Sequence, residues 1–215
     1  LSTPYAVSMV DGILTTARSQ GWSVIFADTG GDTSERRRAV DELCSRQVDA
    51  IIYAAMYHQE VIVEEGLSDV FVLNSFADRD DVPGVVPDEE RAAYEATTHL
   101  IELGHDRIAH LAHDSDAAAV GLRIAGYRRA LVSHGLPWDE RLLLRGDNDP
   151  AGADETATRL LDLDPRPTAV FCYNDAMAAG VYRQVARRGL RIPQDLSVVG
   201  FDDLELISTN LDPQL

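Results

Sequence analysis

Two polar side chains, each directly after an uncharged apolar run, offer chemistry for binding hydroxyl groups. Asn174 follows the run 169–173, and Asp202 follows the run 196–201. An amide both donates and accepts hydrogen bonds, whereas a carboxylate only accepts them, so this pair suits a ligand rich in hydroxyl groups. The two runs themselves are typical of strands that are buried on both faces of a parallel sheet.

The segment between the two runs predicts how these side chains are brought together. Residues 175–188 carry apolar side chains at helical spacing, and Gly189 ends the helix. A strand, a helix and a strand in this order form a right-handed crossover with parallel strands. The carboxyl ends of the strands then lie side by side, and small ligands bind at that edge of open α/β sheets.

Other interpretations of these side chains remain open. Asn174 alternatively serves only as the cap of the helix that follows it. Asp202 and Asp203 are candidates for an acid–base pair or a metal site. Adjacent residues at a strand end point in different directions, so we expect no joint action. Capping of a following helix is a further alternative for Asp203.

Three histidines and the sequence motifs bear on metal binding and catalysis. His110 and His113 differ by an odd number of positions, so they point to opposite faces of a strand and are not expected to share a metal. His105 follows a glycine that ends a helix, and we expect it to be structural. The sequence has no nucleophile elbow around a serine and no phosphate-binding loop. We therefore expect neither catalysis nor a bound cofactor or metal.

The composition is that of a soluble globular protein with an acidic surface. The 215 residues are 45% hydrophobic and 26% charged, which are ordinary values. No apolar run approaches the ~20 residues of a membrane span. The net charge is −17, which repels nucleic acid. Cys44 and Cys172 fit no zinc spacing, and we expect buried free thiols in a reducing compartment.

Helices and strands are expected to alternate, which predicts an α/β fold of two similar Rossmann-like lobes with parallel sheets flanked by helices. Ser2 and Thr3 are expected to cap the first helix. In the first half we expect helices at 4–20, 32–47 and 58–65, and strands at 23–27, 50–53, 70–73 and 85–86. In the second half we expect helices at 89–103, 118–134 and 151–163, and strands at 107–112 and 142–144 ahead of the runs described above.

The stretch 174–203, NDAMAAGVYRQVARRGLRIPQDLSVVGFDD, resembles the effector-binding domain of the lactose/galactose repressor (LacI/GalR) family of bacterial transcription regulators. Other stretches that match are QVDAII at 47–52, HLIELGHDRIA at 99–109 and RIAGYRRAL at 123–131. The resemblance implies a periplasmic-binding-protein-like fold of type I, with a ligand cleft between the lobes. It implies an N-terminal lobe at 1–88 without the family's first strand, a C-terminal lobe at 89–209, and the start of a crossing back at 210–215.

The resemblance also implies which side chains contact the ligand. It places Arg123 where the family holds ligand oxygens by forked donation, and Asn174 and Asp202 where it meets ligand hydroxyls. An exposed, solvated side chain is the alternative for Arg123, and a packing role is the alternative for Tyr5. Asn148 replaces a frequent aromatic residue of the family, which favours a more polar ligand. His113 replaces a usual glycine, where it is expected to narrow the cleft or contact the ligand. The further candidates at cleft positions are Tyr5, Asn74, His113 and Asn148.

The resemblance implies the function of a sensor domain in a DNA-binding transcriptional regulator, a repressor, in the cytoplasm. A small effector, a sugar or polyol, is expected to bind between the lobes, and lobe closure is expected to reach operator DNA through an N-terminal helix-turn-helix that these residues do not contain. A homodimer without membrane contact is expected. The alternative is the substrate-binding protein of a sugar ABC transporter.

Overall fold

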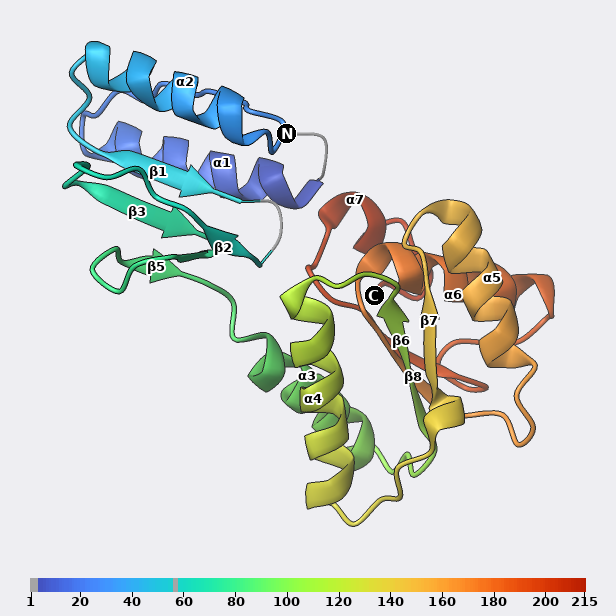
Figure 1. Ribbon diagram of the computed structural model, residues 1–215. Coiled ribbons are helices and arrows are strands. Elements are labelled where there is room, and N and C mark those ends of the chain that lie inside the picture. The colour runs from blue at the N-terminus through green and yellow to red at the C-terminus, as the bar shows by residue number, and fades with distance from the viewer. Residues whose placement is uncertain (1–3, 56–57) are drawn as a thin grey trace. The chain divides into compact units, whose positions relative to one another are not determined.

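Parallel strands form the centre of both halves of the chain (Figure 1). The computed structural model describes residues 4–55 and 58–215, with side chains from residue 6 onward, and the predicted cap residues Ser2 and Thr3 lie outside that part. Two compact units, 1–87 and 88–215, emerge from the contacts within the chain. Every strand pairing is parallel, and helices flank the sheets, so the predicted α/β class is confirmed.

The second unit is a doubly wound sheet in the strand order β7-β6-β8-β9. The chain runs from β6 outward to β7 and then crosses to β8 on the other side, so the winding direction changes between β6 and β8. Ligands bind at such switch points. Its elements are α3 (Glu89–Glu102), β6 (Ile108–His113), α4 (Ala118–Ser133), η1 (Glu140–Leu142), β7 (Leu143–Gly146), α5 (Pro150–Leu161), β8 (Ala169–Cys172), α6 (Asp175–Arg187), β9 (Ser197–Val199) and α7 (Glu205–Ser208).

The uncharged run at 169–173 is explained by two separate cores. Along β8, Val170 and Cys172 face the core that α5 and α6 cover, whereas Ala169 and Phe171 face the core that α3 and α4 cover. All four residues have no exposed surface. Because alternate side chains point to opposite faces, a strand between two helix layers must be apolar at every position.

The helix layers pack closely enough to require glycine. A methyl group at Gly126 of α4 would clash with the carbonyl oxygen of Glu90 and lie 2.9 Å from Cβ of Ala93, both in α3. A methyl group at Gly180 of α6 would lie 2.7 Å from the carbonyl oxygen of Ala153 in α5. These close approaches fix α4 on α3 and α6 on α5.

The first unit has a smaller sheet. Its main sheet has the order β1-β3-β5, and β2 and β4 form a separate parallel pair. The core lies where the α2 residue Val40 packs against alternate residues of β1 and β3. Its elements are α1 (Pro4–Ser19), α2 (Thr33–Ser45), β1 (Ile51–Ala54), β2 (Glu60–Val61), β3 (Val70–Leu73), β4 (Phe76–Ala77) and β5 (Gly84–Val85).

Two predicted elements of the first unit are wrong. Residues 58–65 form no helix, because Val61 and Val63 are buried while Ile62 is 59% exposed, and this alternation belongs to extended backbone. Residues 23–27 form no strand. Ile25 and Phe26 are both about half exposed, and within the described residues no strand pairs with this segment.

Three smaller corrections concern the second unit and the thiols. The predicted strand 196–201 is shorter, at 197–199, and half-buried, since β9 pairs only with β8 among the described strands. The predicted strand 142–144 begins and ends later, at 143–146. Cys172 is buried as predicted, and burial raises the pKa of its thiol, but Cys44 is exposed.

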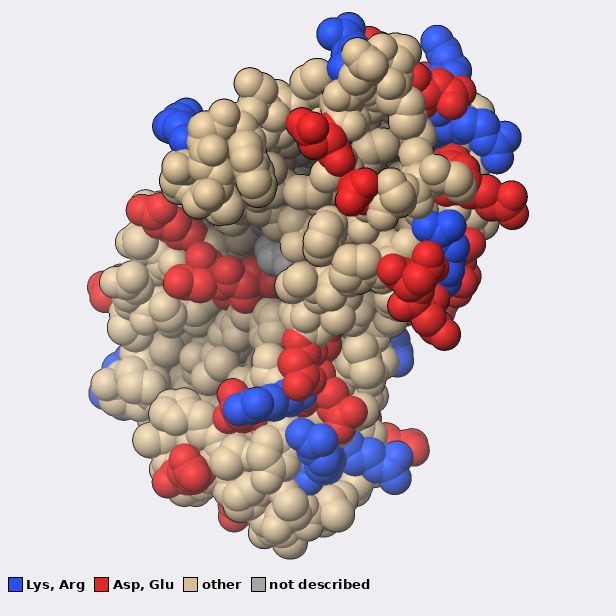
Figure 2. Space-filling model, turned by 90° about the vertical axis from the view of Figure 1, so that its left-hand side faces the viewer, with Lys and Arg blue, Asp and Glu red and all other residues tan. Residues whose placement is uncertain are grey.

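Acidic side chains are spread over the surface. Figure 2 shows Asp and Glu more widely distributed than Arg on the face that it draws. Within the described residues, no helix is both long and apolar enough to span a membrane.

Gly126→Ala is expected to destabilise the protein by about 1–3 kcal/mol, because the added methyl group meets the α3 backbone and overpacks the contact. Gly121→Ala, in the same helix, is the matched control, since nothing lies within 4 Å of its added methyl group. It is expected to raise stability by up to about 1 kcal/mol. Urea unfolding of both variants measures the difference, and equal midpoints would contradict the close packing.

Candidate functional site

Asn174 connects the end of β8 to the start of α6. Its side-chain oxygen Oδ1 accepts a hydrogen bond from the backbone N–H of Met177 at 3.0 Å, so the predicted capping role is confirmed. Asn174 is buried, with 8% of its surface exposed. Among the contacts of the described residues, the amide nitrogen Nδ2 makes no hydrogen bond, which leaves this donor for a ligand.

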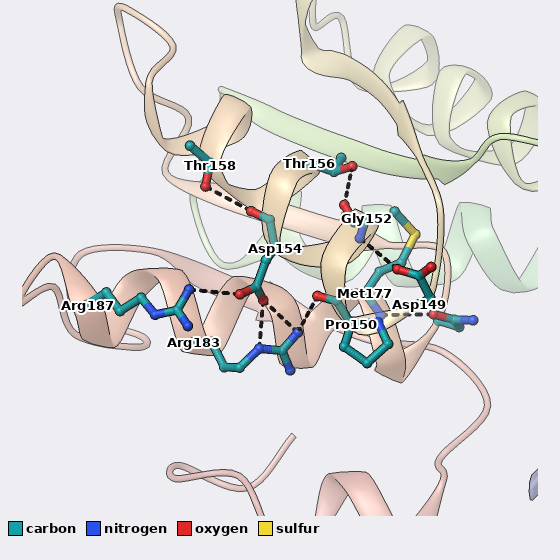
Figure 3. Close-up of polar contacts among 10 residues, drawn as sticks. Asp149, Pro150, Gly152, Asp154, Thr156, Thr158, Met177, Arg183 and Arg187 are labelled. Carbon is teal, nitrogen blue, oxygen red and sulfur yellow. Dashed lines mark hydrogen bonds and ion pairs between the residues drawn. The ribbon is translucent and has the colours of Figure 1, made fainter.

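The helix that Asn174 caps is joined to α5 by ion pairs between Asp154 of α5 and two arginines of α6 (Figure 3). Asp154 accepts hydrogen bonds from Nε of Arg183 at 2.6 Å and from Nη1 of Arg187 at 2.8 Å. Arg183 also donates to the carbonyl oxygen of Pro150 at 3.2 Å. Together with the close approach at Gly180, these contacts fix α6 against α5.

Asp175 ties the tip of β8 to the tip of β9. Its backbone N–H donates to the carbonyl oxygen of Phe201 at 3.0 Å. Its carboxylate accepts from the N–H groups of Phe201 at 2.9 Å and Leu204 at 2.6 Å. A methyl group at Gly200 would clash with this carboxylate. The strand ladder therefore ends at Val199, and the turn after it is built around Asp175.

Asp202 occupies the turn that Asp175 holds. Its backbone has a φ of 91°, in the left-handed region. Its side chain is 17% exposed and lies 3.8 Å from Nη2 of Arg123. The pKa of Asp202 is raised to about 6, chiefly by burial; Arg123 opposes the rise, and Asp175 and Glu89 add to it. The carboxyl group also lines an open surface hollow.

Asp203 has a separate role. It is exposed, has a φ of 47°, and accepts a hydrogen bond from the Ser208 hydroxyl at 3.3 Å. The residue at the cap position of α7 is Leu204. The capping alternative for Asp203 is therefore wrong.

Arg123 is buried in the second turn of α4, with 5% of its surface exposed. Its Nε donates to Oε2 of Glu89 at 2.6 Å, and its Nη1 donates to the carbonyl oxygen of Tyr173. Its guanidinium carbon lies 3.6 Å from the ring centroid of Phe201 and 4.3 Å from that of Tyr173, which adds cation–π attraction. The alternative of an exposed, solvated Arg123 is wrong.

Two histidines of β6 lie in different surroundings. His113 ends the strand, and its ring stacks on that of Tyr173 at a centroid distance of 5.6 Å. His110 is fully buried and stacks on Phe171 at 4.6 Å. Burial lowers its pKa to about 4, although its hydrogen bond to the Phe171 carbonyl favours the charged form. Within the described residues no group of metal-ligating side chains includes either one.

His105 joins two strands at the opposite end of the sheet. Its Nδ1 lies 2.9 Å from Oγ1 of Thr168, and its Nε2 lies 2.9 Å from Oγ of Ser197. Thr168 precedes β8 and Ser197 begins β9. The structural role expected of His105 is confirmed.

The remaining candidates are not drawn into this cluster by any contact in the described residues. Asn148 is exposed in the connection between β7 and α5, at the same edge of the sheet. Asn74 belongs to the first unit, where its Nδ2 donates to the carbonyl oxygen of Ala55 at 3.0 Å and links the ends of β1 and β3. The side chain of Tyr5 lies outside the described part of the chain.

The arrangement offers hydrogen-bond donors and an acceptor that suit a polar ligand. It presents amide and guanidinium donors from Asn174 and Arg123, and a carboxylate acceptor from Asp202, beside the ring of Tyr173. Glu89 and Asp175 are parts of this site that the sequence did not reveal. An acidic residue in the first turn of a helix ordinarily faces solvent, and nothing in the local pattern marks these two as buried.

Comparisons with known proteins identify the family to which the chain belongs. A family described as periplasmic binding proteins and sugar binding domain of LacI family matches residues 1–213. The HTH-type transcriptional repressor PurR of Vibrio atlanticus is 33% identical over 92% of this chain and 60% of that protein. The HTH-type transcriptional repressor CytR of Escherichia coli K12 is 31% identical over 94% of this chain and 60% of that protein.

A solved structure extends the likeness to three dimensions. The crystal structure of a LacI-family transcriptional regulator from Rhizobium etli, described there as putative, matches with a TM-score of 0.89 and 33% identity. The match covers 99% of this chain and 79% of that one. The chain spans 60% of the length of each repressor named above, so it corresponds to a part of them.

Asp202→Asn is expected to change how stability depends on pH. The folded-state pKa of Asp202 is raised to about 6 from 3.8, so the unfolded chain loses its proton first as the pH rises. As the pH rises from about 4 to about 6, the free energy of unfolding of the wild type is expected to fall by up to about 3 kcal/mol relative to the variant. Above that range the difference is expected to stay constant. Urea unfolding from pH 4.5 to 7.5 measures this, and a constant difference between the proteins would contradict it.

Asp175→Asn is expected to destabilise the protein by about 1–3 kcal/mol. The NH2 group of the new amide cannot accept a hydrogen bond, so one of the two backbone N–H groups that Asp175 binds loses its acceptor. Asp162→Asn is the control, since Asp162 is 65% exposed and pairs with Arg188 at the surface. That pair is expected to contribute less than about 1 kcal/mol. Thermal unfolding compares the two variants, and similar losses in both would rule out the proposed role of Asp175.

Proposed function

This chain belongs to the family of periplasmic binding proteins and sugar-binding domains of LacI-family regulators, and from that premise we propose that it is the effector-binding domain of a transcriptional repressor. The proposed effector is a sugar or polyol. It binds at the carboxyl edge of the sheet β7-β6-β8-β9, with Arg123, Asn174 and Asp202 as its polar contacts.

The observation that carries the proposal is the convergence of three elements on one guanidinium group. Arg123 from α4 meets Tyr173 at the end of β8, and Phe201 and Asp202 at the end of β9. Donors, an acceptor and aromatic faces then lie at the switch point of the sheet, where ligands bind in doubly wound folds. Hydroxyl groups match this mixture because each one both donates and accepts.

The relatives favour a repressor over a transport protein. PurR and CytR are both named HTH-type transcriptional repressors, and each aligns with more than nine tenths of this chain. The transporter alternative shares the fold, but the relatives named here are repressors.

DNA contact is proposed for a helix-turn-helix outside these 215 residues. The net charge of −17 disfavours phosphate contact by this region itself. His113, Asn148, Asn74 and Tyr5 stay candidate ligand contacts. A homodimer in the cytoplasm, and transmission of ligand binding through a change in the arrangement of the two units, stay predictions from the family resemblance.

Calorimetry with a panel of neutral sugars and polyols tests the proposal. The wild type is expected to bind at least one member. Asn174→Ser keeps a capping oxygen but removes the amide donor, and is expected to weaken that binding about tenfold. Asp202→Asn removes the anionic acceptor and is expected to weaken it about 10- to 100-fold.

Asp32→Ser provides a matched control for the cap substitution. Asp32 caps α2 in the first unit, where it accepts from the N–H groups of Ser34 and Glu35. Its replacement is expected to leave ligand affinity unchanged. Wild-type affinity in both Asn174→Ser and Asp202→Asn would refute this placement of the site.

A further inference from the structure

We propose that Glu89 makes this site selective for uncharged ligands, because it neutralises Arg123 and thereby excludes anionic effectors such as sugar phosphates. The inference rests on the proposed function, since it names the charge class of the effector at the same site. Its support comes from the contacts of Arg123 and from the charges around it.

The first support is the engagement of the guanidinium group. Nε donates to Glu89 at 2.6 Å, and the Arg123 and Glu89 side chains are only 6% and 4% exposed. Nη1 donates to the carbonyl oxygen of Tyr173, and aromatic rings cover the group. Only Nη2 is directed elsewhere, and it lies 3.8 Å from Asp202. Each of the two forked edges of the guanidinium, Nε–Nη2 and Nη1–Nη2, therefore already has one of its donors engaged, which disfavours bidentate binding of a phosphate or carboxylate.

The second support is the balance of charge. Glu89, Asp175 and Asp202 interact electrostatically with one another or with the single cation Arg123, and Asp203 adds a further carboxylate beside Asp175. Carboxyl groups thus outnumber the guanidinium. Burial is the main cause of the raised pKa of Asp202; Arg123 lowers this pKa, and Asp175 and Glu89 each raise it.

Glu89 is placed to decide this balance. It is the first residue of α3, whose cap is Asp88, so the helix N-terminus stabilises its negative charge. The close packing of α4 on α3 at Gly126 fixes Arg123 over Glu89. Without Glu89, a buried arginine beside a ligand site would attract anions.

Calorimetry at pH 7.5 on the intact protein tests the proposal with matched pairs, namely ribose and ribose 5-phosphate, glucose and glucose 6-phosphate, and fructose and fructose 6-phosphate. In the wild type, the phosphorylated member of a binding pair is expected to bind roughly 100-fold more weakly, because like charges meet at the site. Equal or tighter binding of the phosphorylated member would overturn the proposal, and this comparison needs no variant.

Glu89→Gln tests the named residue. The substitution keeps an oxygen that accepts from Nε but removes the charge. It is expected to reduce the ratio of affinities for the neutral and the phosphorylated sugar about tenfold. Glu90→Gln is the matched control, since Glu90 is the next residue of α3 and pairs with Arg129 at the surface at 2.6 Å. Glu90→Gln is expected to keep the wild-type affinity ratio. A folded Glu89→Gln protein with the wild-type affinity ratio would reject the role of Glu89.

A titration without ligand separates this inference from the proposed function. If no member of any pair binds, the sugar class proposed above fails, and carbon-13 NMR of the Asp202 carboxyl group then decides the inference. In Glu89→Gln, Arg123 is free to turn toward Asp202, and the pKa of Asp202 is expected to fall by about one unit or more. In Glu90→Gln it is expected to stay at the wild-type value. An unchanged pKa in Glu89→Gln would overturn the proposal.

Discussion

The organisation of the second unit depends on one buried guanidinium group. Arg123 belongs to α4, bonds Glu89 of α3, and contacts the residues that end β8 and begin the turn after β9. A buried cation is tolerated only when its charge and its donors are satisfied, so these elements must arrive at fixed positions. The need to pair its charge and donors therefore aligns the α3–α4 layer with the carboxyl edge of the sheet. The same group that orders the edge also faces the space where a ligand is expected.

Much of the second unit was predictable because its signals are local. An uncharged run of four or five residues between helices indicates a strand covered on both faces, and Ala169–Cys172 fulfils this with complete burial. Asn174 directly before an apolar helix indicates a cap, and its hydrogen bond to Met177 follows. The position of Asp202 at the same edge as Asn174 required only the parallel crossover, because neighbouring parallel strands end at the same edge.

The failures of prediction arise where the outcome depends on distant partners. Residues 58–65 contain polar positions that suit a helix, but burial of Val61 and Val63 on one face selects extended backbone. Residues 23–27 have strand composition, yet a strand also needs a partner for its backbone, and the described residues supply none. Glu89 and Asp175 look like ordinary helix-start acids in sequence. Their burial follows from Arg123, 34 residues from Glu89, and from the turn at Phe201, 26 residues from Asp175.

The left-handed backbone at Asp202 limits how this position can evolve. At a φ of 91°, residues other than Gly, Asn and Asp have a strained backbone. An aspartate codon becomes an asparagine or a glycine codon through a single nucleotide change. Descendants of this protein can therefore exchange an anionic acceptor for a neutral amide, or for empty space, without reshaping the turn. Divergence toward new small molecules has a short mutational route at this residue, while the surrounding backbone stays the same.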